Sequence, residues 1–341
     1  MELTEKRKLL NAAGSAVELV KNFSGLEEYF PATKRECFEK MLATLSDGGA
    51  YFSSLCKRME AEKIAPIFEG DELYPKAFAG LEHAPLCLYA KGNTRLLEER
   101  LFAVVGSRRT VETARKAGKQ IAEALSHSFT VLTGAADGGD EAAIEGAFAG
   151  SGKVIALIAG GFSATPQGNL PLLKRVEETG LLLSACSYDT PVRVYSYEVR
   201  NELLAALSVG VLVLGAAKKS GALITAKYAK EQGKPLFAIP YPLGTTAGEG
   251  CNALIKAGAR LTESAADIFQ AFGMEAAEER QVALGETEAK TLEALKELSE
   301  AHIGELSKTL GLPVFKLTAT LAALEMKGLA VKLGGNRYGA V

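Results

Sequence analysis

Short apolar runs alternate with amphipathic segments along the middle of the chain. The runs are apolar almost throughout, rather than at every second position: LFAVV (101–105), FTVLT (129–133), VIALIA (154–159), LLLSA (181–185), VGVLVLG (209–215) and PLFAIP (235–240). Strands of this kind are typical of a parallel sheet covered by helices on both faces. Helical patterns lie between most of them. We therefore predict a Rossmann-like, doubly wound α/β domain with a mainly parallel sheet over residues 66–273.

The two ends of the chain carry different patterns. Residues 1–65 space their apolar side chains at helical intervals, as in KLLNAAGSAVELVKNF, and predict a small helical domain. Residues 274–288 are charged and poor in core residues, so we predict a linker there. Residues 289–341 show three helical patterns and then two apolar runs around Gly-Gly-Asn, which is a hairpin signal. This order predicts a winged helix.

Composition narrows the classes of function. The chain has 341 residues and a net charge of -2, whereas a protein that coats long duplex DNA usually has a basic excess. Five scattered cysteines without C-x-x-C spacing and three distant histidines predict neither a disulfide framework nor a metal site, and we expect no cofactor. No apolar run approaches about 18 residues, and the N-terminus lacks a secretory pattern. We therefore expect a cytoplasmic protein without a membrane span.

In an open α/β sheet, ligands bind beyond the carboxyl ends of the strands, so the loops that follow the strands are the candidate sites. After LFAVV comes GSRRT (106–110). Gly106 allows a close turn, Ser107 offers a hydroxyl and Arg108 offers a planar fork suited to phosphate. A plain turn with a surface arginine is the alternative interpretation.

A stronger candidate follows VGVLVLG. Lys219 precedes Ser220 and Gly221, which we expect to begin the helix ALITAKYAKEQG. A lysine, a hydroxyl and the free amides of a helix start would converge on one point and form a phosphate cradle. The alternative is that Ser220 only caps the helix and the lysines only meet solvent.

The remaining loops exclude familiar enzyme classes. TGAADGGDEAA (133–143) contains Gly134, but it is not G-x-G-x-x-G, and no Walker A pattern occurs, which argues against an NAD enzyme or a P-loop ATPase. Asp137 and Asp140 in this loop are predicted helix caps. No histidine is placed for a Ser-His-Asp set. The sequence favours a binding protein over a hydrolase.

Taken together, several segments resemble the DNA-processing protein A family (DprA, also called Smf). They are YPKAFAGLEHAPLCLYAKGN, VVGSRRT, RNELLAALS, KKSGALITAKYAKEQGKPLFAIP and GCNALIKAGA, in that order. The resemblance is firmest over the middle of the chain, and its ends look like the family's SAM-like, helix-hairpin-type domain and winged helix. It implies a non-catalytic homodimer that binds single-stranded DNA, protects incoming strands in natural transformation and helps to load the RecA recombinase.

The resemblance also places the strand pocket at particular residues. They are Gly106, Ser107, Arg108, Gly134, Arg200, Asn201, Lys219, Ser220, Gly221, Thr225 and Asn252. From the residues alone, Arg200 and Asn201 could equally be a solvated helix end, and Asn252 could cap a helix or present its amide to a base or a phosphate.

This chain departs from the family's usual motifs. Asp137 takes an often basic place, Glu198 replaces a proline, Glu202 replaces an arginine, Ile144 replaces a histidine and Gly215 replaces a glutamate. Added carboxylates near the pocket should weaken DNA binding, by ~1 kcal/mol each where partly buried. Two alternatives therefore stay open, namely a diverged pocket that binds a nucleotide or nucleotide derivative, and a scaffold without a ligand. The winged helix balances seven basic residues against seven glutamates from residue 284 on, so a protein contact is as compatible with it as weak DNA binding.

Overall fold

The computed structural model describes residues 39–40, 43, 50–81, 83–163, 170–274, 284–298, 300–327 and 329–340. The chain divides into two compact units, Met1–Ala276 and Ala277–Val341, which are described separately. Most of the predicted N-terminal helical domain lies outside the described residues. The division between the units falls inside the segment predicted as a linker, and the domain boundaries taken from the sequence stay predictions.

Within the described part of the first unit, nine strands form one sheet in the order β1-β2-β6-β5-β4-β3-β7-β8-β9. The strands are β1 Ala65–Phe68, β2 Cys87–Gly92, β3 Leu101–Gly106, β4 Thr130–Thr133, β5 Val154–Ile158, β6 Leu181–Ser184, β7 Val211–Gly215, β8 Leu236–Ala238 and β9 Arg260–Leu261. The seven strands from β6 to β9 in this order are parallel, whereas β2 pairs antiparallel with both β1 and β6. The apolar runs thus form the parallel part of the sheet, as predicted.

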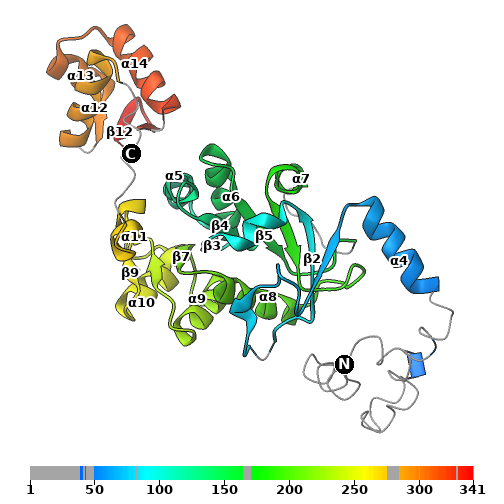
Figure 1. Cartoon of the computed structure of the whole chain (residues 1–341). Coiled ribbons are helices and arrows are strands. Elements are labelled where there is room, and N and C mark those ends of the chain that lie inside the picture. Colours follow the sequence, from blue (N-terminus) through cyan, green and yellow to red (C-terminus); the bar gives the residue numbers. More distant parts are fainter. Residues whose placement is uncertain are drawn as a thin grey trace. The chain divides into compact units, whose positions relative to one another are not determined.

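Helices cover both faces of this sheet. They are α4 Ala50–Ala61, α5 Glu112–Ser126, α6 Gly139–Ala149, α7 Leu170–Thr179, α8 Val194–Leu207, α9 Ala222–Glu231, α10 Glu249–Lys256 and α11 Ala265–Ala271, with short 3-10 turns at η3 Lys76–Phe78, η4 Thr94–Glu98 and η5 Thr246–Gly248. Figure 1 shows α5, α6 and α7 on one face and α8, α9 and α10 on the other. The predicted doubly wound α/β fold is confirmed.

Aromatic packing closes one end of the core. The Phe102 ring lies 5.5 Å from that of Phe129, 5.8 Å from Phe237 and 6.1 Å from Phe272, measured between ring centroids. Burying each such ring stabilises the fold by roughly 1.5–3 kcal/mol. Because Phe272 directly follows α11, this cluster ties the last helix of the unit to the sheet.

The second unit runs helix, strand, two helices and two strands, which is the order of a winged helix. Its elements are α12 Glu286–Leu298, β10 Glu300–His302, α13 Ile303–Leu310, α14 Val314–Met326, β11 Ala330–Leu333 and β12 Arg337–Ala340. The three strands pair in the order β10-β12-β11, so β10 is added to the predicted hairpin. Leu295, Leu306, Leu317, Leu321 and Leu324 form a fully buried core.

In the described ranges, no single helix is long and apolar enough to cross a membrane, and the bent pair of α13 and α14 is so only when the two helices are counted together.

Candidate functional site

The strand order reverses between β3 and β7, and the candidate loops meet at this point. From β3 the chain adds β4, β5 and β6 on one side, and it then returns through α8 to place β7 on the other side. The amide of Ser107 after β3 donates to the carbonyl oxygen of Gly215 at 2.8 Å, and the amide of Gly139 donates to the carbonyl oxygen of Ser107 at 3.2 Å. The loops after β3, β4 and β7 therefore form one surface, as expected for a ligand site in such a sheet.

The loop after β4 is held against β3 by Asp140. Its carboxylate accepts from the amide of Gly106 at 2.9 Å and from the amide of Ala136 at 3.2 Å. The N-cap position of α6 is taken by Gly138, so Asp140 does not cap this helix as predicted. The carboxylate instead ties the end of β3 to the loop after β4.

Arg200 is buried beneath these loops. Only 7% of the residue is exposed, and its Nη1 donates to the carbonyl oxygens of Gly134 and, at 3.1 Å, of Leu157. Burial lowers the pKa of Arg200 and raises the pKa of its neighbour Asp140, while the attraction between the two opposite charges counters both shifts. Arg200 therefore joins α8 to the ends of β4 and β5, and it holds the loop after β4 in place from inside the protein.

Three further predicted residues are also engaged with the protein itself. Asn201 donates from Nδ2 to the carbonyl oxygen of Gly221 at 3.1 Å, and Thr225 is 1% exposed. Asn252 accepts from the amide of Tyr241 at 3.0 Å and donates to its carbonyl oxygen at 2.9 Å. These side chains hold the start of α9 and the loop after β8 in place. Their contribution to a site is therefore to support its loops rather than to contact a ligand.

The exposed members of the predicted set lie in two adjacent turns. Arg108, Lys219 and Gly221 are exposed, and Ser107 and Ser220 are half-buried. In the part of the chain that the structure describes, neither Arg108 nor Lys219 has an ion-pair partner, whereas the neighbouring Lys218 lies 3.8 Å from Glu249. The Ser220 hydroxyl accepts from the amide of Ala222 at 3.3 Å, at the first turn of α9. Two cations, two hydroxyls and the start of a helix thus share one surface suited to an anion.

The carboxylates that depart from the family pattern have different environments. Asp137 and Glu198 are exposed, and the Tyr228 hydroxyl donates to Glu198 at 3.4 Å. Glu202 is buried, and its carboxylate lies 2.9 Å from Nδ1 of His83, in the segment before β2. The carboxylate of Glu202 therefore faces His83, and of these three departures Asp137 and Glu198 are the two whose carboxylates would oppose an anion at the surface.

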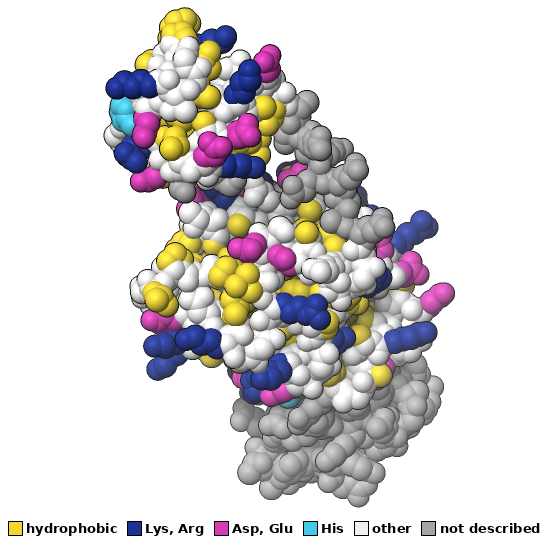
Figure 2. Space-filling model, turned by 90° about the vertical axis from the view of Figure 1, so that its left-hand side faces the viewer, with side chains coloured by type: hydrophobic (Ala, Val, Ile, Leu, Met, Phe, Trp, Pro, Cys, Tyr) yellow, Lys and Arg dark blue, Asp and Glu magenta, His cyan; other side chains and the backbone are white. Residues whose placement is uncertain are grey.

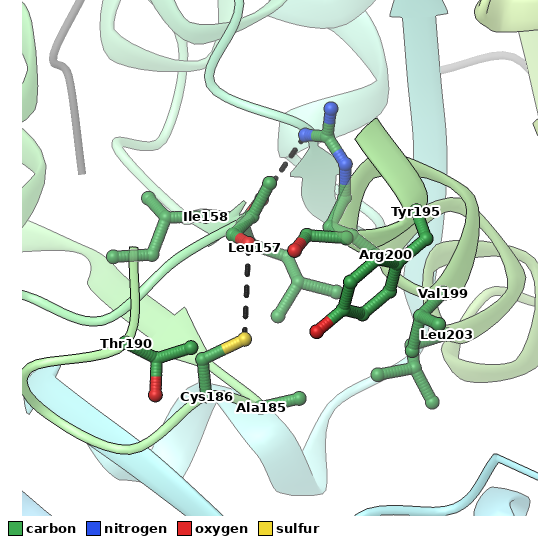
Figure 3. A pocket seen from close by; sticks show the side chains of 11 residues that line it. Leu157, Ile158, Ala185, Cys186, Thr190, Tyr195, Val199, Arg200 and Leu203 are labelled. Carbon is green, nitrogen blue, oxygen red and sulfur yellow. Dashed lines mark hydrogen bonds between the residues drawn. The ribbon is translucent and has the colours of Figure 1, made fainter. Parts of the chain in front are cut away.

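Sequence reasoning missed a small cavity beside these loops. It has a volume of about 80 Å³ and lies at the carboxyl ends of β5 and β6, against the start of α8 (Figure 3). Leu157, Val199 and Leu203 give it apolar walls, and Thr190 and Tyr195 add polar groups. The only sequence signal was the unusually aromatic start of α8, VYSY. In the described residues, no group of three or more His, Cys, Asp or Glu side chains is arranged to hold a metal ion.

Comparison with known proteins points to one family. The family model described as DNA recombination-mediator protein A matches residues 65–273. The DNA processing protein DprA of Streptococcus pneumoniae (strain ATCC BAA-255 / R6) is 34% identical over 214 residues, which cover 62% of this chain and 76% of that protein.

Solved structures agree with this match. The X-ray structure of DprA from Streptococcus pneumoniae aligns with a TM-score of 0.60 and 27% identity, and the alignment covers 79% of this chain and 98% of that chain. A structure of DNA processing protein A from Helicobacter pylori, described for its single-stranded DNA binding mode, aligns with a TM-score of 0.56 and 27% identity over 62% of this chain and 95% of that chain. Because the family model spans more than half of the chain, this protein belongs to the DNA recombination-mediator protein A family, the DprA/Smf family whose motifs its sequence carries.

Proposed function

We propose that this protein binds single-stranded DNA without catalysis, and that a backbone phosphate lies between the turns after β3 and β7. The observation that carries the proposal is the hydrogen bond of 2.8 Å from Ser107 to Gly215. It sets the Arg108 turn beside the Lys219 turn at the switch point of the sheet. A phosphate there would meet two cations and the first amides of α9.

Membership of the family and the likeness to the Helicobacter pylori protein support this choice of ligand. A net charge of -2 does not oppose it, because a single strand needs only a local groove of positive charge. Buried Arg200 and Asn201 would act by holding the loops, while Arg108, Lys219 and Ser220 would touch the strand.

The test is fluorescence anisotropy of a labelled oligo-dT strand at two salt concentrations. It compares charge reversals at the candidate site with a charge reversal at the far end of α9. Lys219→Glu and Arg108→Glu should each weaken binding at least about tenfold, or about 1.4 kcal/mol. Lys230→Glu is the matched control, because it makes the same charge change on an exposed lysine in the last turn of α9. Its effect should be small.

Two outcomes would contradict the proposal. Equal weakening by Lys219→Glu and Lys230→Glu would mean that only overall charge matters. An absence of binding at low salt would mean that the surface carboxylates Asp137 and Glu198 prevail, and a panel of nucleotides in a thermal-shift assay would then test the diverged-pocket alternative.

We further infer that the protein works as a cytoplasmic homodimer that protects strands and passes them to the RecA recombinase. The dimer has a candidate surface at β9, which in the described part of the chain is the last strand of the sheet and pairs with β8 on one side. Leu261 on this strand is 47% exposed, and Leu243 in the loop after β8 is 97% exposed. Figure 2 shows apolar side chains among scattered charges on this side of the α/β unit. Leu261→Glu should lower the mass measured by light scattering from dimer to monomer, and an unchanged mass would remove this surface.

The RecA step can be tested separately. RecA should assemble on strands coated with single-strand-binding protein faster in the presence of wild-type protein than with Lys219→Glu. Equal rates would limit the protein to strand binding.

A further inference from the structure

The first turn of α8 exposes apolar and aromatic side chains. Val194 is 90% exposed, Tyr195 is 60% exposed and Tyr197 is 36% exposed. Single exposed apolar residues are common on proteins, but a contiguous group that includes two aromatic rings is typical of a binding surface. Because α8 starts after β6, this turn lies at the same edge of the sheet as the candidate phosphate site.

The cavity of about 80 Å³ adjoins this turn. Leu157 and Ile158 enter it from β5, Cys186 and Thr190 come from the loop after β6, and Tyr195 borders it from α8 (Figure 3). The walls are mainly apolar, and the polar atoms are few. A nucleobase has the same character, with apolar faces and polar edges, so its chemistry matches the cavity and the adjoining ring.

Arg200 connects this cavity with the candidate phosphate site. It lines the cavity, and the same side chain donates to the carbonyl oxygen of Gly134 in the loop after β4. Its Nε–H is buried and has no acceptor among the described residues. Arg200 therefore couples one wall of the cavity to the loop after β4.

We propose that Tyr195 and the adjoining cavity bind one pyrimidine base of the DNA strand, with the base stacked on the Tyr195 ring. The small volume of the cavity favours a single-ring base over a purine. This inference rests on the proposed function, because it takes the strand to run from the Lys219 turn toward α8. Base stacking on an aromatic side chain tolerates many sequences, and the cavity would add a preference.

The experiment compares three labelled strands of equal length and equal phosphate charge: oligo-dT, oligo-dA and an abasic strand. Each is titrated with wild type, Tyr195→Ala and Tyr195→Phe. Wild type should bind oligo-dT roughly tenfold more tightly than the abasic strand, with oligo-dA between them. Tyr195→Ala should remove most of this difference, and Tyr195→Phe should retain it because the ring remains. Tyr51→Ala is the control, since Tyr51 is a similarly exposed tyrosine on α4 at 42%.

The failure of this inference differs from the failure of strand binding itself. If wild type binds oligo-dT and the abasic strand equally, or if Tyr195→Ala weakens both strands by the same factor, then the base subsite is wrong and the phosphate site stands. If no strand binds, both proposals fall. Lys219→Glu distinguishes the phosphate site from the base subsite, because it should weaken the binding of the oligo-dT and abasic strands by the same factor. Circular dichroism melting of each variant excludes unfolding as the cause.

Discussion

Gly106 and Gly139 meet where the loops after β3 and β4 cross, and neither has room for a side chain. A Cβ atom on Gly106 would lie 2.8 Å from the Cα of Gly139, and a Cβ on Gly139 would meet the Cα of Gly106 at closer range still. This contact lets the Arg108 turn and the start of α6 share one surface. The glycines therefore serve close approach of two backbones.

Substituting Gly139→Ala should force these loops apart. We expect the free energy of unfolding to fall by about 1–3 kcal/mol because the added methyl group meets backbone atoms that cannot rotate away. The affinity for oligo-dT should fall with it. Gly221→Ala is the matched control at the other turn of the site, since nothing lies within 4 Å of a Cβ there. Its unfolding free energy in urea should change by less than about 0.5 kcal/mol. Equal stabilities for the two variants would contradict this account of the contact.

Removing the guanidinium of Arg200 should lower the free energy of unfolding more than a substitution at an exposed position does. Arg200→Met leaves Asp140 buried without its opposite charge, and it leaves the carbonyl oxygens of Gly134 and Leu157 without this donor. Breaking a buried pair in this way typically costs about 3–5 kcal/mol. Arg109→Met, at an exposed position beside the site, is the control.

The pH dependence of this loss has a defined sign. Losing the positive charge should raise the pKa of Asp140 further, because Arg200 is what counters the effect of burial. A raised pKa in the folded state favours folding at low pH, so the deficit of Arg200→Met should be largest at neutral pH and should shrink on acidification. Urea unfolding at a series of pH values measures it. A deficit that grows on acidification would contradict the pairing.

Much of this fold could be predicted because its information is local. Apolar runs such as Val211–Gly215 are buried at every position, and that pattern marks a strand covered on both faces. The strands β1, β2 and β9 were missed for the opposite reason. Both residues of β9 are exposed, and β2 alternates between buried and partly buried positions near a sheet edge.

The residues of the candidate site likewise separate into those that the local sequence indicates and those that depend on distant contacts. Arg108 and Lys219 directly follow apolar strand runs in the sequence, so the sequence alone names them as candidates. The burial of Arg200 could not, because an arginine in a helix looks the same whether it faces solvent or Asp140. Likewise Asn252 and the exposed Tyr195 depend on which loops pack beside them, and this is set by contacts between residues distant in sequence.

The thiol of Cys251 should be inert in the folded protein. Burial raises its pKa to about 12, and the thiolate is the form that reacts with alkylating reagents. At pH 8, iodoacetamide should therefore label the exposed Cys56 but not Cys251, and both should react after unfolding in urea. Peptide mass spectrometry reads out each site. Rapid labelling of native Cys251 would show that α10 opens from the sheet.

The ion pair between Arg58 and Asp189 should make the docking of α4 depend on pH. Nη1 and Nη2 of Arg58 donate to the two carboxylate oxygens of Asp189 at 3.0 and 2.6 Å, and Ser163 donates to the same carboxylate at 2.8 Å. These donors, Arg58 first, lower the pKa of Asp189. A lowered pKa stabilises the docked state at every pH above the ordinary aspartate value. That contribution is lost as the pH falls through the lowered value.

Asp189→Asn should reproduce the acid state at neutral pH, because the amide keeps the shape of the carboxyl group and removes its charge. We expect faster hydrogen exchange of the α4 amides in this variant at pH 7, while the amides of β3 and β7 keep their protection. Glu60→Gln is the control, since it removes one charge from an exposed position on α4 itself. The same α4 amides should lose protection in wild type only below the ordinary pKa of an aspartate. If Asp189→Asn and wild type exchange alike, the charge of Asp189 does not hold α4, and contacts such as the Met59, Ile64 and Tyr188 cluster do.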